Sequence, residues 1–188
     1  MRPHENCGCG RATAMQSRRT VLAGCACAAA VPIAASFFAS AASAQFTPDD
    51  ERFMRMALEQ ARIADFPFGA VIVGNGKVMA LGRNLGRTHG DPTAHGEMVA
   101  IRRFLDKHPA TALRGTTIYT TGEPCAMCMG AILWCHIGRL VFAASLAQLA
   151  TKIDQIMITS AQLAEASKFA PIAITGGVLA DEAMALFK

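Results

Sequence analysis

Internal repeats, linkers and low-complexity stretches are all missing from this sequence after residue 45. Their absence argues against a repeat protein and against several tethered domains. Residues 45–188 are numerous enough to bury a hydrophobic core of their own. We therefore expect one folded domain over residues 45–188.

Cysteine is scarce in the same region. Four of the seven cysteines precede residue 45, which leaves Cys125, Cys128 and Cys135. Three thiols do not make the disulfide framework that stabilises many small secreted proteins. The C-x-x-C spacing of the first two is typical of metal ligands, and we expect Cys135 to pack in the core.

A strong excess of positive charge is missing too. The whole chain has a formal net charge of +4, but its first 44 residues contain four arginines and one glutamate. The remaining 14 Lys and Arg and 13 Asp and Glu leave residues 45–188 with a net charge of +1. Nucleic-acid binding needs cations that neutralise phosphates, so the sequence makes a nucleic-acid partner unlikely.

The first 44 residues have the features of an export signal. Ser17–Leu22 (SRRTVL) resembles a twin-arginine motif, an Ala-rich apolar run follows, and Ala42–Ala44 is an A-x-A cleavage site. We predict cleavage after Ala44 and a periplasmic or otherwise exported protein that meets a membrane only during export. A disordered or membrane-anchoring tail is the alternative, and Leu22–Cys25 also resembles a lipobox, although few apolar residues precede Cys25.

His95, Cys125 and Cys128 are candidate metal ligands. An imidazole with two thiolates is a donor set that suits zinc. Structural zinc usually has four protein ligands, whereas catalytic zinc has three and leaves one position for water. Cys135 and His136 lie about two helical turns beyond Cys128, roughly 10 Å along the axis, which is too far for the same tetrahedron. We therefore predict a single zinc ion at an open, catalytic site.

Two other interpretations of these residues stay open. His89 precedes a Gly-Asp-Pro turn and could complete a closed structural zinc site with four ligands. A redox-active C-x-x-C is less well supported, because no thioredoxin-like βαβ pattern surrounds Cys125.

The ligands are expected at the starts of two helices. Asp91–Thr93 forms a turn and cap before His95, and apolar residues then recur at helical spacing: Met98, Ile101 and Leu105. Pro124 suits the first position of a second helix, with Cys125 and Cys128 one turn apart on one face. Both helix N-termini would then point their positive ends at the metal site, which favours thiolates.

Glu97 is the candidate catalytic residue. It follows His95 by two residues, so its side chain is poorly placed to share the direction of the ligand. A carboxylate beside a metal-activated water can take up a proton and pass it to a leaving amine. A Glu at a helix start can also simply complement the helix dipole. Because three metal ligands surround Glu97, we predict the catalytic role.

Hydrophobic periodicity predicts helices that alternate with strands. The expected elements are a helix from 47 to about 65, a hairpin over 68–82, the first ligand-bearing helix, a strand over 116–120, the second ligand-bearing helix, a strand over 140–143, an Ala-rich helical segment, a strand over 172–175 and a last helix through 186. This pattern indicates an α/β fold in layers.

Residues 49–188 resemble the cytidine deaminase-like superfamily, and most closely its guanine deaminase and tRNA-type adenosine deaminase branch. The resemblance rests on four segments: Pro67–Val73 (PFGAVIV), Asp91–Glu97 (DPTAHGE), Glu123–Cys128 (EPCAMC) and Gly130–Ile132. H-x-E followed by P-C-x-x-C is the signature of zinc-dependent nucleobase deaminases. One departure is Gly96, where this branch usually has Ala, and we do not expect it to affect catalysis.

The resemblance implies an α/β fold of the three-layer α/β/α sandwich type, with a mixed five-stranded sheet. It also implies one zinc ion per subunit and a homodimer. The implied reaction is hydrolytic replacement of a ring amino group by a carbonyl, with release of ammonia and with Glu97 moving protons.

Four residues are candidates for substrate binding because of the resemblance. Asn84 matches an Asn that contacts base or ribose, Trp134 matches an aromatic position of guanine deaminase-like members, and Asp154 matches a carboxylate that receives the N–H edge of guanine. Each also has a structural interpretation: a strand-end turn for Asn84, core filling for Trp134 and a solvated helix charge for Asp154. Phe68 is the fourth candidate, and core packing is its alternative role.

The resemblance leaves the substrate open. An exported enzyme does not meet the tRNA pool, and the small net charge agrees with that. We therefore favour a free base or a related small aminoheterocycle, with guanine first. The alternatives are a tRNA adenosine or a cytosine or cytidine, and a non-catalytic structural zinc protein is a remote one.

Overall fold

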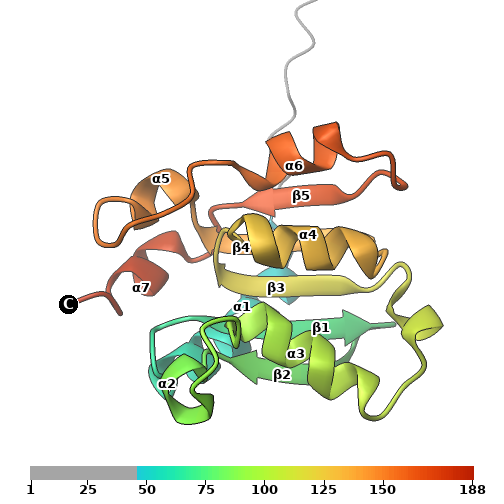
Figure 1. The fold of residues 1–188 in the computed structure, drawn as a ribbon, viewed down its shortest axis with the longest axis horizontal. Coiled ribbons are helices and arrows are strands. Elements are labelled where there is room, and N and C mark those ends of the chain that lie inside the picture. Colours follow the sequence, from blue (N-terminus) through green and yellow to red (C-terminus); the bar gives the residue numbers. More distant parts are fainter. Residues whose placement is uncertain (1–45) are drawn as a thin grey trace, which may run out of the picture. The chain divides into compact units, whose positions relative to one another are not determined.

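One mixed sheet organises the residues that the computed structural model describes, 46–188 (Figure 1). Its strand order is β2-β1-β3-β4-β5. The strands are β1 (Gly69–Gly74), β2 (Lys77–Arg83), β3 (Thr117–Gly122), β4 (Arg139–Ala144) and β5 (Ala173–Gly176). β1 is antiparallel to β2 and β3, whereas β3, β4 and β5 are parallel. The predicted mixed five-stranded sheet is confirmed, while the predicted export signal over residues 1–44 lies outside the described residues.

The predicted hairpin over 68–82 is formed by β1 and β2, which are joined by a turn at Asn75 and Gly76. Asn75 and Gly76 both have positive φ, 49° and 70°, as the two central residues of a type I′ turn require. That turn matches the right-handed twist of the strands that it joins. β1 is buried along nearly its whole length because helices cover both faces of the sheet.

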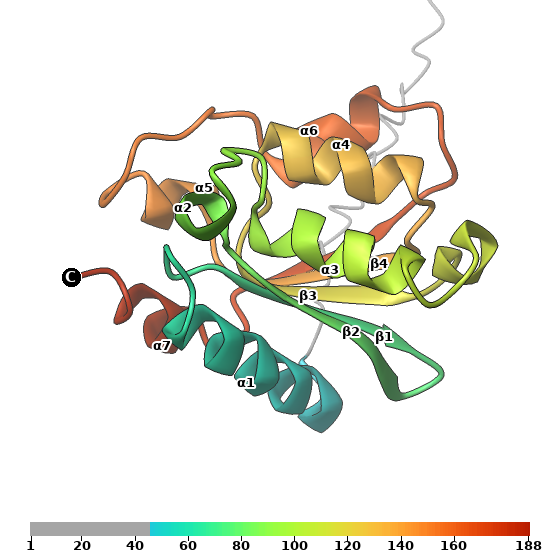
Figure 2. The same cartoon turned by 60° about the horizontal axis from the view of Figure 1, so that its bottom comes forward.

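Helices form the two outer layers of the sandwich (Figure 2). α1 (Pro48–Arg62) and α7 (Ala180–Met184) cover one face, and α3 (Gly96–Leu105), α4 (Ala126–Trp134) and α6 (Ser160–Ala166) cover the other. Alternate residues of β1 serve the two cores: Val71 packs with the α1 side and Ile72 with the α3 and α4 side. The predicted three-layer α/β/α architecture is confirmed. No helix within residues 46–188 is long and apolar enough to cross a bilayer.

α3 approaches the sheet closely at a glycine. A Cβ atom at Gly82 of β2 would overlap the carbonyl oxygen of Gly96 and the backbone of Ala100. Only a residue without a side chain lets α3 pack at this depth. The packing fixes the N-terminal end of α3, where His95 and Glu97 lie.

The Ala-rich segment after β4 differs from the prediction. It forms two short helices, α5 (Leu146–Leu149) and α6, separated by a non-helical connection over residues 150–159. Each helix begins with a capping box, Ser145 with Gln148 and Thr159 with Gln162. These S/T-x-x-Q patterns mark two separate helix starts. Two further elements were not predicted: α2 (Gly86–His89) and the 3₁₀ turn η1 (Ala110–Leu113).

Candidate metal centre and active site

Three side chains from two helix starts converge on one point. The Nδ1 atom of His95 lies 3.6 Å from the Sγ atom of Cys125 and 3.6 Å from that of Cys128. All three donor atoms lie within 4.8 Å of one another. A tetrahedral zinc with a Zn–N bond of about 2.0–2.1 Å and Zn–S bonds of about 2.3 Å separates N and S by about 3.6 Å. The donor set therefore fits zinc in both chemistry and spacing.

The local sequence explains how the donors are held. His95 and Cys125 are the N-cap residues of α3 and α4, with extended backbones, and Cys128 lies in the first turn of α4. The predicted position at two helix starts is confirmed. Pro124 precedes the N-cap instead of opening the helix, because α4 begins at Ala126.

The two thiols of this centre differ in acidity. A hydrogen bond from the Cys128 thiol, with further help from His95, lowers the pKa of Cys125 to about 4. The same pairing, together with burial, raises the pKa of Cys128. The hydrogen bond to Cys125 in turn raises the pKa of His95. A divalent cation held by the three atoms would stabilise both thiolates and the neutral imidazole.

A fourth protein ligand is not found among residues 46–188. The only group of metal-binding side chains in that range is His95, Cys125 and Cys128. His89 is exposed at the end of α2 and does not join them. Cys135 is half-buried and packs against the core that lies between the sheet and α4, as predicted. Within the described residues the centre therefore offers three protein donors, the number that is typical of catalytic zinc.

Glu97 lies beside the donor atoms without belonging to them. It is the second residue of α3, only 6% exposed, and it lines the same cavity as His95 and Cys125. Burial raises the pKa of its carboxyl. A carboxyl with a raised pKa next to a metal centre suits an exchange of protons with a reacting water.

The cavity at the metal centre has a volume of about 50 Å³. Its lining residues are Phe68, His95, Glu97, Glu123, Cys125, Leu149 and Gln155. Phe68 is the one predicted substrate-binding residue in this lining, and its ring also packs edge-on against Phe187. The sequence reasoning missed Glu123, Leu149 and Gln155. Glu123 could have been suspected from its place in the EPC motif and Gln155 from its neighbour Asp154.

Asn84 and Asp154 lie outside this lining. Asn84 is buried at the end of β2, and its Oδ1 accepts a hydrogen bond from the backbone N–H of Gly86 at 3.0 Å. That contact agrees with the strand-end turn considered for Asn84. Asp154 is exposed on the connection between α5 and α6, and its neighbour Gln155 is the residue that reaches the cavity. Substrate contact by either residue stays a prediction.

Trp134 lies at the C-terminal end of α4, away from the ligand-bearing end. Its side chain is 73% exposed and packs edge-on against Phe169, with ring centroids 4.8 Å apart. The exposure excludes the core-filling role. Trp134 does not line the cavity at the metal centre of its own chain, so its contact with a base stays a prediction.

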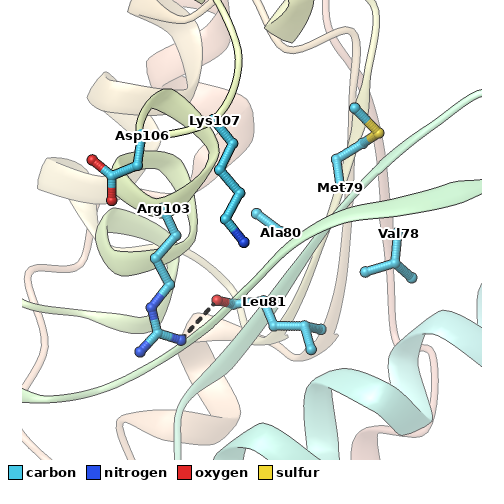
Figure 3. Close-up of a pocket in the computed structure, with 7 residues that line it drawn as sticks. All are labelled: Val78, Met79, Ala80, Leu81, Arg103, Asp106 and Lys107. Carbon is cyan, nitrogen blue, oxygen red and sulfur yellow. Dashed lines mark hydrogen bonds between the residues drawn. The ribbon is translucent and has the colours of Figure 1, made fainter.

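A larger cavity of about 460 Å³ lies elsewhere, between β2 and the C-terminal half of α3 (Figure 3). Arg103 reaches across it and donates a hydrogen bond to the carbonyl oxygen of Leu81 at 3.1 Å. None of the metal-centre residues lines this cavity. Because His95, Cys125 and Glu97 line the smaller cavity, we assign the reactive site to that cavity.

Comparison with known families shows that the metal centre lies in a zinc-binding region shared by a family of deaminases. The family model of the cytidine and deoxycytidylate deaminase zinc-binding region matches residues 47–144. That range contains the three donors and Glu97, and it makes up more than half of the chain.

Two curated relatives represent two kinds of deaminase. The tRNA-specific adenosine deaminase of Haemophilus influenzae is 44% identical over 101 residues, which are 51% of this chain and 58% of that protein. The guanine deaminase of Bacillus subtilis is 46% identical over 78 residues, which are 42% of this chain and 50% of that protein. The chain thus spans little more than half the length of these relatives.

Solved structures give a longer match. A structure of guanine deaminase from Nitrosomonas europaea superposes with a TM-score of 0.65 at 27% identity, over 76% of this chain and 84% of that one. A structure in complex with 2,6-diaminopurine has a TM-score of 0.64 at 30% identity, over 76% of this chain and 82% of that one. The similarity therefore extends beyond the zinc-binding region.

Proposed function

The chain belongs to the deaminase family defined by the cytidine and deoxycytidylate deaminase zinc-binding region, and on that basis we propose that it deaminates a free aminopurine base, with guanine as the first candidate. The reaction is hydrolysis: water and a ring N=C–NH₂ group give a ring HN–C=O group and ammonia. The similarity to a guanine deaminase and to a structure with bound 2,6-diaminopurine supports a purine substrate.

The composition of the cavity wall is the observation that favours a free base over a base within a nucleic acid. None of the seven residues that line it is Lys or Arg. Proteins that bind nucleic acid neutralise its phosphates with Lys and Arg side chains. The net charge of +1 over residues 45–188 agrees with a small uncharged ligand. Phe68 and Leu149 supply an apolar wall for a flat ring.

His95, Cys125 and Cys128 would hold the zinc ion. When bound, zinc supplies Lewis acidity that makes a water molecule acidic near neutral pH. The Glu97 carboxylate accepts a proton of the attacking water and delivers it to the amino nitrogen, which leaves as ammonia. The second proton of the water ends on the ring nitrogen beside the new carbonyl. Burial of Glu97 favours its protonated form and so eases uptake of that proton.

A second candidate is deamination of adenosine in tRNA. The specific observation behind it is the 44% identity to the tRNA-specific adenosine deaminase of Haemophilus influenzae. It requires the chain to meet RNA and to bind its phosphates with residues outside the cavity wall.

An ammonia-release assay of the zinc-loaded protein separates the two. The substrates are guanine, 2,6-diaminopurine, cytosine, adenosine and an anticodon stem-loop with an adenosine. We expect release from guanine, and none from the stem-loop. Release from the stem-loop alone would reject the free-base proposal in favour of the tRNA candidate.

We further propose that the protein is exported, as the twin-arginine-like segment Ser17–Leu22 implies. Amino-terminal sequencing of the native protein tests this, and a start at Gln45 is the expected result.

We also propose a homodimer. The outward side of α4 is apolar, with Met127 and Ala131 only partly covered and Trp134 exposed, and sedimentation equilibrium tests the dimer.

A further inference from the structure

Glu123 holds the starts of two helices with its two carboxylate oxygens. Oε2 accepts a hydrogen bond from the backbone N–H of Leu146 at 2.8 Å, and Oε1 accepts one from the backbone N–H of Ser160 at 2.8 Å. Leu146 and Ser160 are the first residues of α5 and α6. Glu123 is only 8% exposed, so both contacts are shielded from water.

These two contacts fix both ends of one segment. The first N–H groups of a helix have no partner inside that helix, and a buried one is costly to leave unpaired. Glu123 satisfies one such group in α5 and one in α6. The 150–159 connection lies between them and carries Gln155, which lines the cavity at the metal centre. The position of Gln155 is thus tied to Glu123.

Glu123 is itself fixed next to the metal ligands. Its backbone N–H donates to the carbonyl oxygen of Ala144 at 2.7 Å, at the end of β4. Pro124 and the ligand Cys125 follow directly in the sequence. Glu123 therefore links the end of β4, the metal-ligand candidate Cys125 and the connection that carries Gln155.

We propose that Glu123 is a positioning residue that holds the 150–159 connection against the cavity, so that Gln155 contacts the substrate. This proposal rests on the proposed function, because it assumes that the cavity binds the base. The amide of Gln155 can donate and accept hydrogen bonds at the same time, which suits a heterocycle edge that offers a carbonyl beside an N–H.

Ser160 provides a matched pair of variants. Its hydroxyl is buried and has no hydrogen-bond partner, so its contact with Glu123 is made by the backbone alone. Ser160→Pro removes that N–H at the first helical position, where proline is well tolerated. Thr159 already has the extended backbone that precedes proline, with φ −69° and ψ 157°. Ser160→Ala keeps the N–H and serves as the control.

The experiment compares the full-length zinc-loaded protein with Glu123→Gln, Ser160→Pro and Ser160→Ala. Zinc content, amide hydrogen exchange over 146–160, and KM and kcat for guanine are measured for each. We expect Glu123→Gln and Ser160→Pro to keep zinc, to exchange faster over 146–160, and to raise KM by about tenfold or more with a smaller change in kcat. Ser160→Ala should match the parent protein.

Three results would overturn the proposal. The first is unchanged exchange over 146–160 in both Glu123→Gln and Ser160→Pro. The second is loss of zinc in Glu123→Gln with 146–160 still protected, since Glu123 would then support the metal-binding turn alone. The third is faster exchange with KM unchanged, because the connection would then not position a substrate-binding residue.

Failure of the proposed function gives a different pattern. If the parent protein releases no ammonia from guanine but does so from another substrate, KM is measured with that substrate. The hydrogen-exchange measurement needs no substrate. Faster exchange in Glu123→Gln and Ser160→Pro, but not in Ser160→Ala, therefore supports the anchoring of the 150–159 connection by Glu123 in either case.

Discussion

Asp50 and Arg139 form a two-point salt bridge between α1 and the start of β4. Nη1 of Arg139 donates to Oδ1 of Asp50 at 2.7 Å, and Nη2 donates to Oδ2 at 3.1 Å. Asp50 is completely buried, and its Oδ1 also accepts a hydrogen bond from the Tyr119 hydroxyl at 3.1 Å. Burial alone would raise the pKa of Asp50, but hydrogen bonds from Arg139 and Thr47 outweigh it and lower the pKa to about 2.

This salt bridge predicts a loss of stability in acid. Because the pKa of Asp50 falls from 3.8 to about 2 on folding, its contribution is complete above about pH 4–5 and is lost as the pH drops towards 2. The contribution is about 2 kcal/mol. Chemical denaturation of the parent and of Asp50→Asn between pH 2 and 7 measures it. The difference between the two should shrink as the pH falls.

Asp49→Asn is the matched control on the same helix. Asp49 is paired with Arg52 on the surface, where both side chains are more than half exposed. Exposed pairs contribute little, so this variant should stay within about 0.5 kcal/mol of the parent at pH 7. Equal effects of the two substitutions would show that burial of Asp50 is not what matters.

Glu97→Gln should retain zinc and lose deamination. The amide keeps the size of the side chain but cannot carry a proton from water to the leaving amine, so kcat should fall by about 10²–10⁴. Zinc content and melting temperature should match those of the parent, because Glu97 is not among the donor atoms. Substantial activity in the zinc-loaded variant would falsify the assigned role.

Replacement of a candidate zinc ligand should first of all lower the zinc content of the protein. Cys128→Ser replaces a fully buried thiolate donor with a poor one. We expect substoichiometric zinc and loss of activity. Zinc added at about a hundred times its dissociation constant stabilises a protein by about 2.7 kcal/mol, and this variant should lack that gain in a thermal-shift titration. Cys135→Ser, on a half-buried thiol outside the donor group, should still show it.

Gly82→Ala should destabilise the fold at the contact between β2 and α3. The added methyl group overlaps the backbone of Gly96 and Ala100, which cannot move without moving the start of α3. Overpacking of this kind costs about 1–3 kcal/mol, or roughly 3–10 °C in melting temperature for a domain of this size. Gly130→Ala in α4 meets no atom of its own chain within 4 Å. Compared at a protein concentration low enough to keep subunits apart, it should be neutral or stabilising. A Gly82→Ala protein as stable as the parent contradicts this account.

The parts of the site that depend on local sequence were predictable. The turn over Asp91–Thr93 and the helical spacing that follows place His95 and Glu97 at the start of α3. The same holds for Cys125 and Cys128, whose one-turn separation on α4 is a property of any helix. For these residues, the turn and the helical periodicity are enough to predict a position at a helix start.

The parts that depend on distant contacts were not predictable. The 150–159 connection is held by Glu123, which lies 23 residues before Leu146 and 37 before Ser160. No local pattern predicts such a contact. The family resemblance therefore points to Asp154, whereas its neighbour Gln155 is the residue that lines the cavity. The exposure of Trp134 could not be predicted either. α4 is apolar on all sides, so its hydrophobic periodicity does not indicate which side faces outward.

The anchors of the 150–159 connection are main-chain groups. The Glu123 carboxylate accepts hydrogen bonds from the backbone N–H groups of Leu146 and Ser160. Every amino acid except proline has the same N–H group at those positions. The ten residues of the 150–159 connection can therefore be exchanged for another sequence while the anchoring stays intact. This makes the protein a natural acceptor for loop grafting, in which new substrate preferences are installed without rebuilding the metal centre.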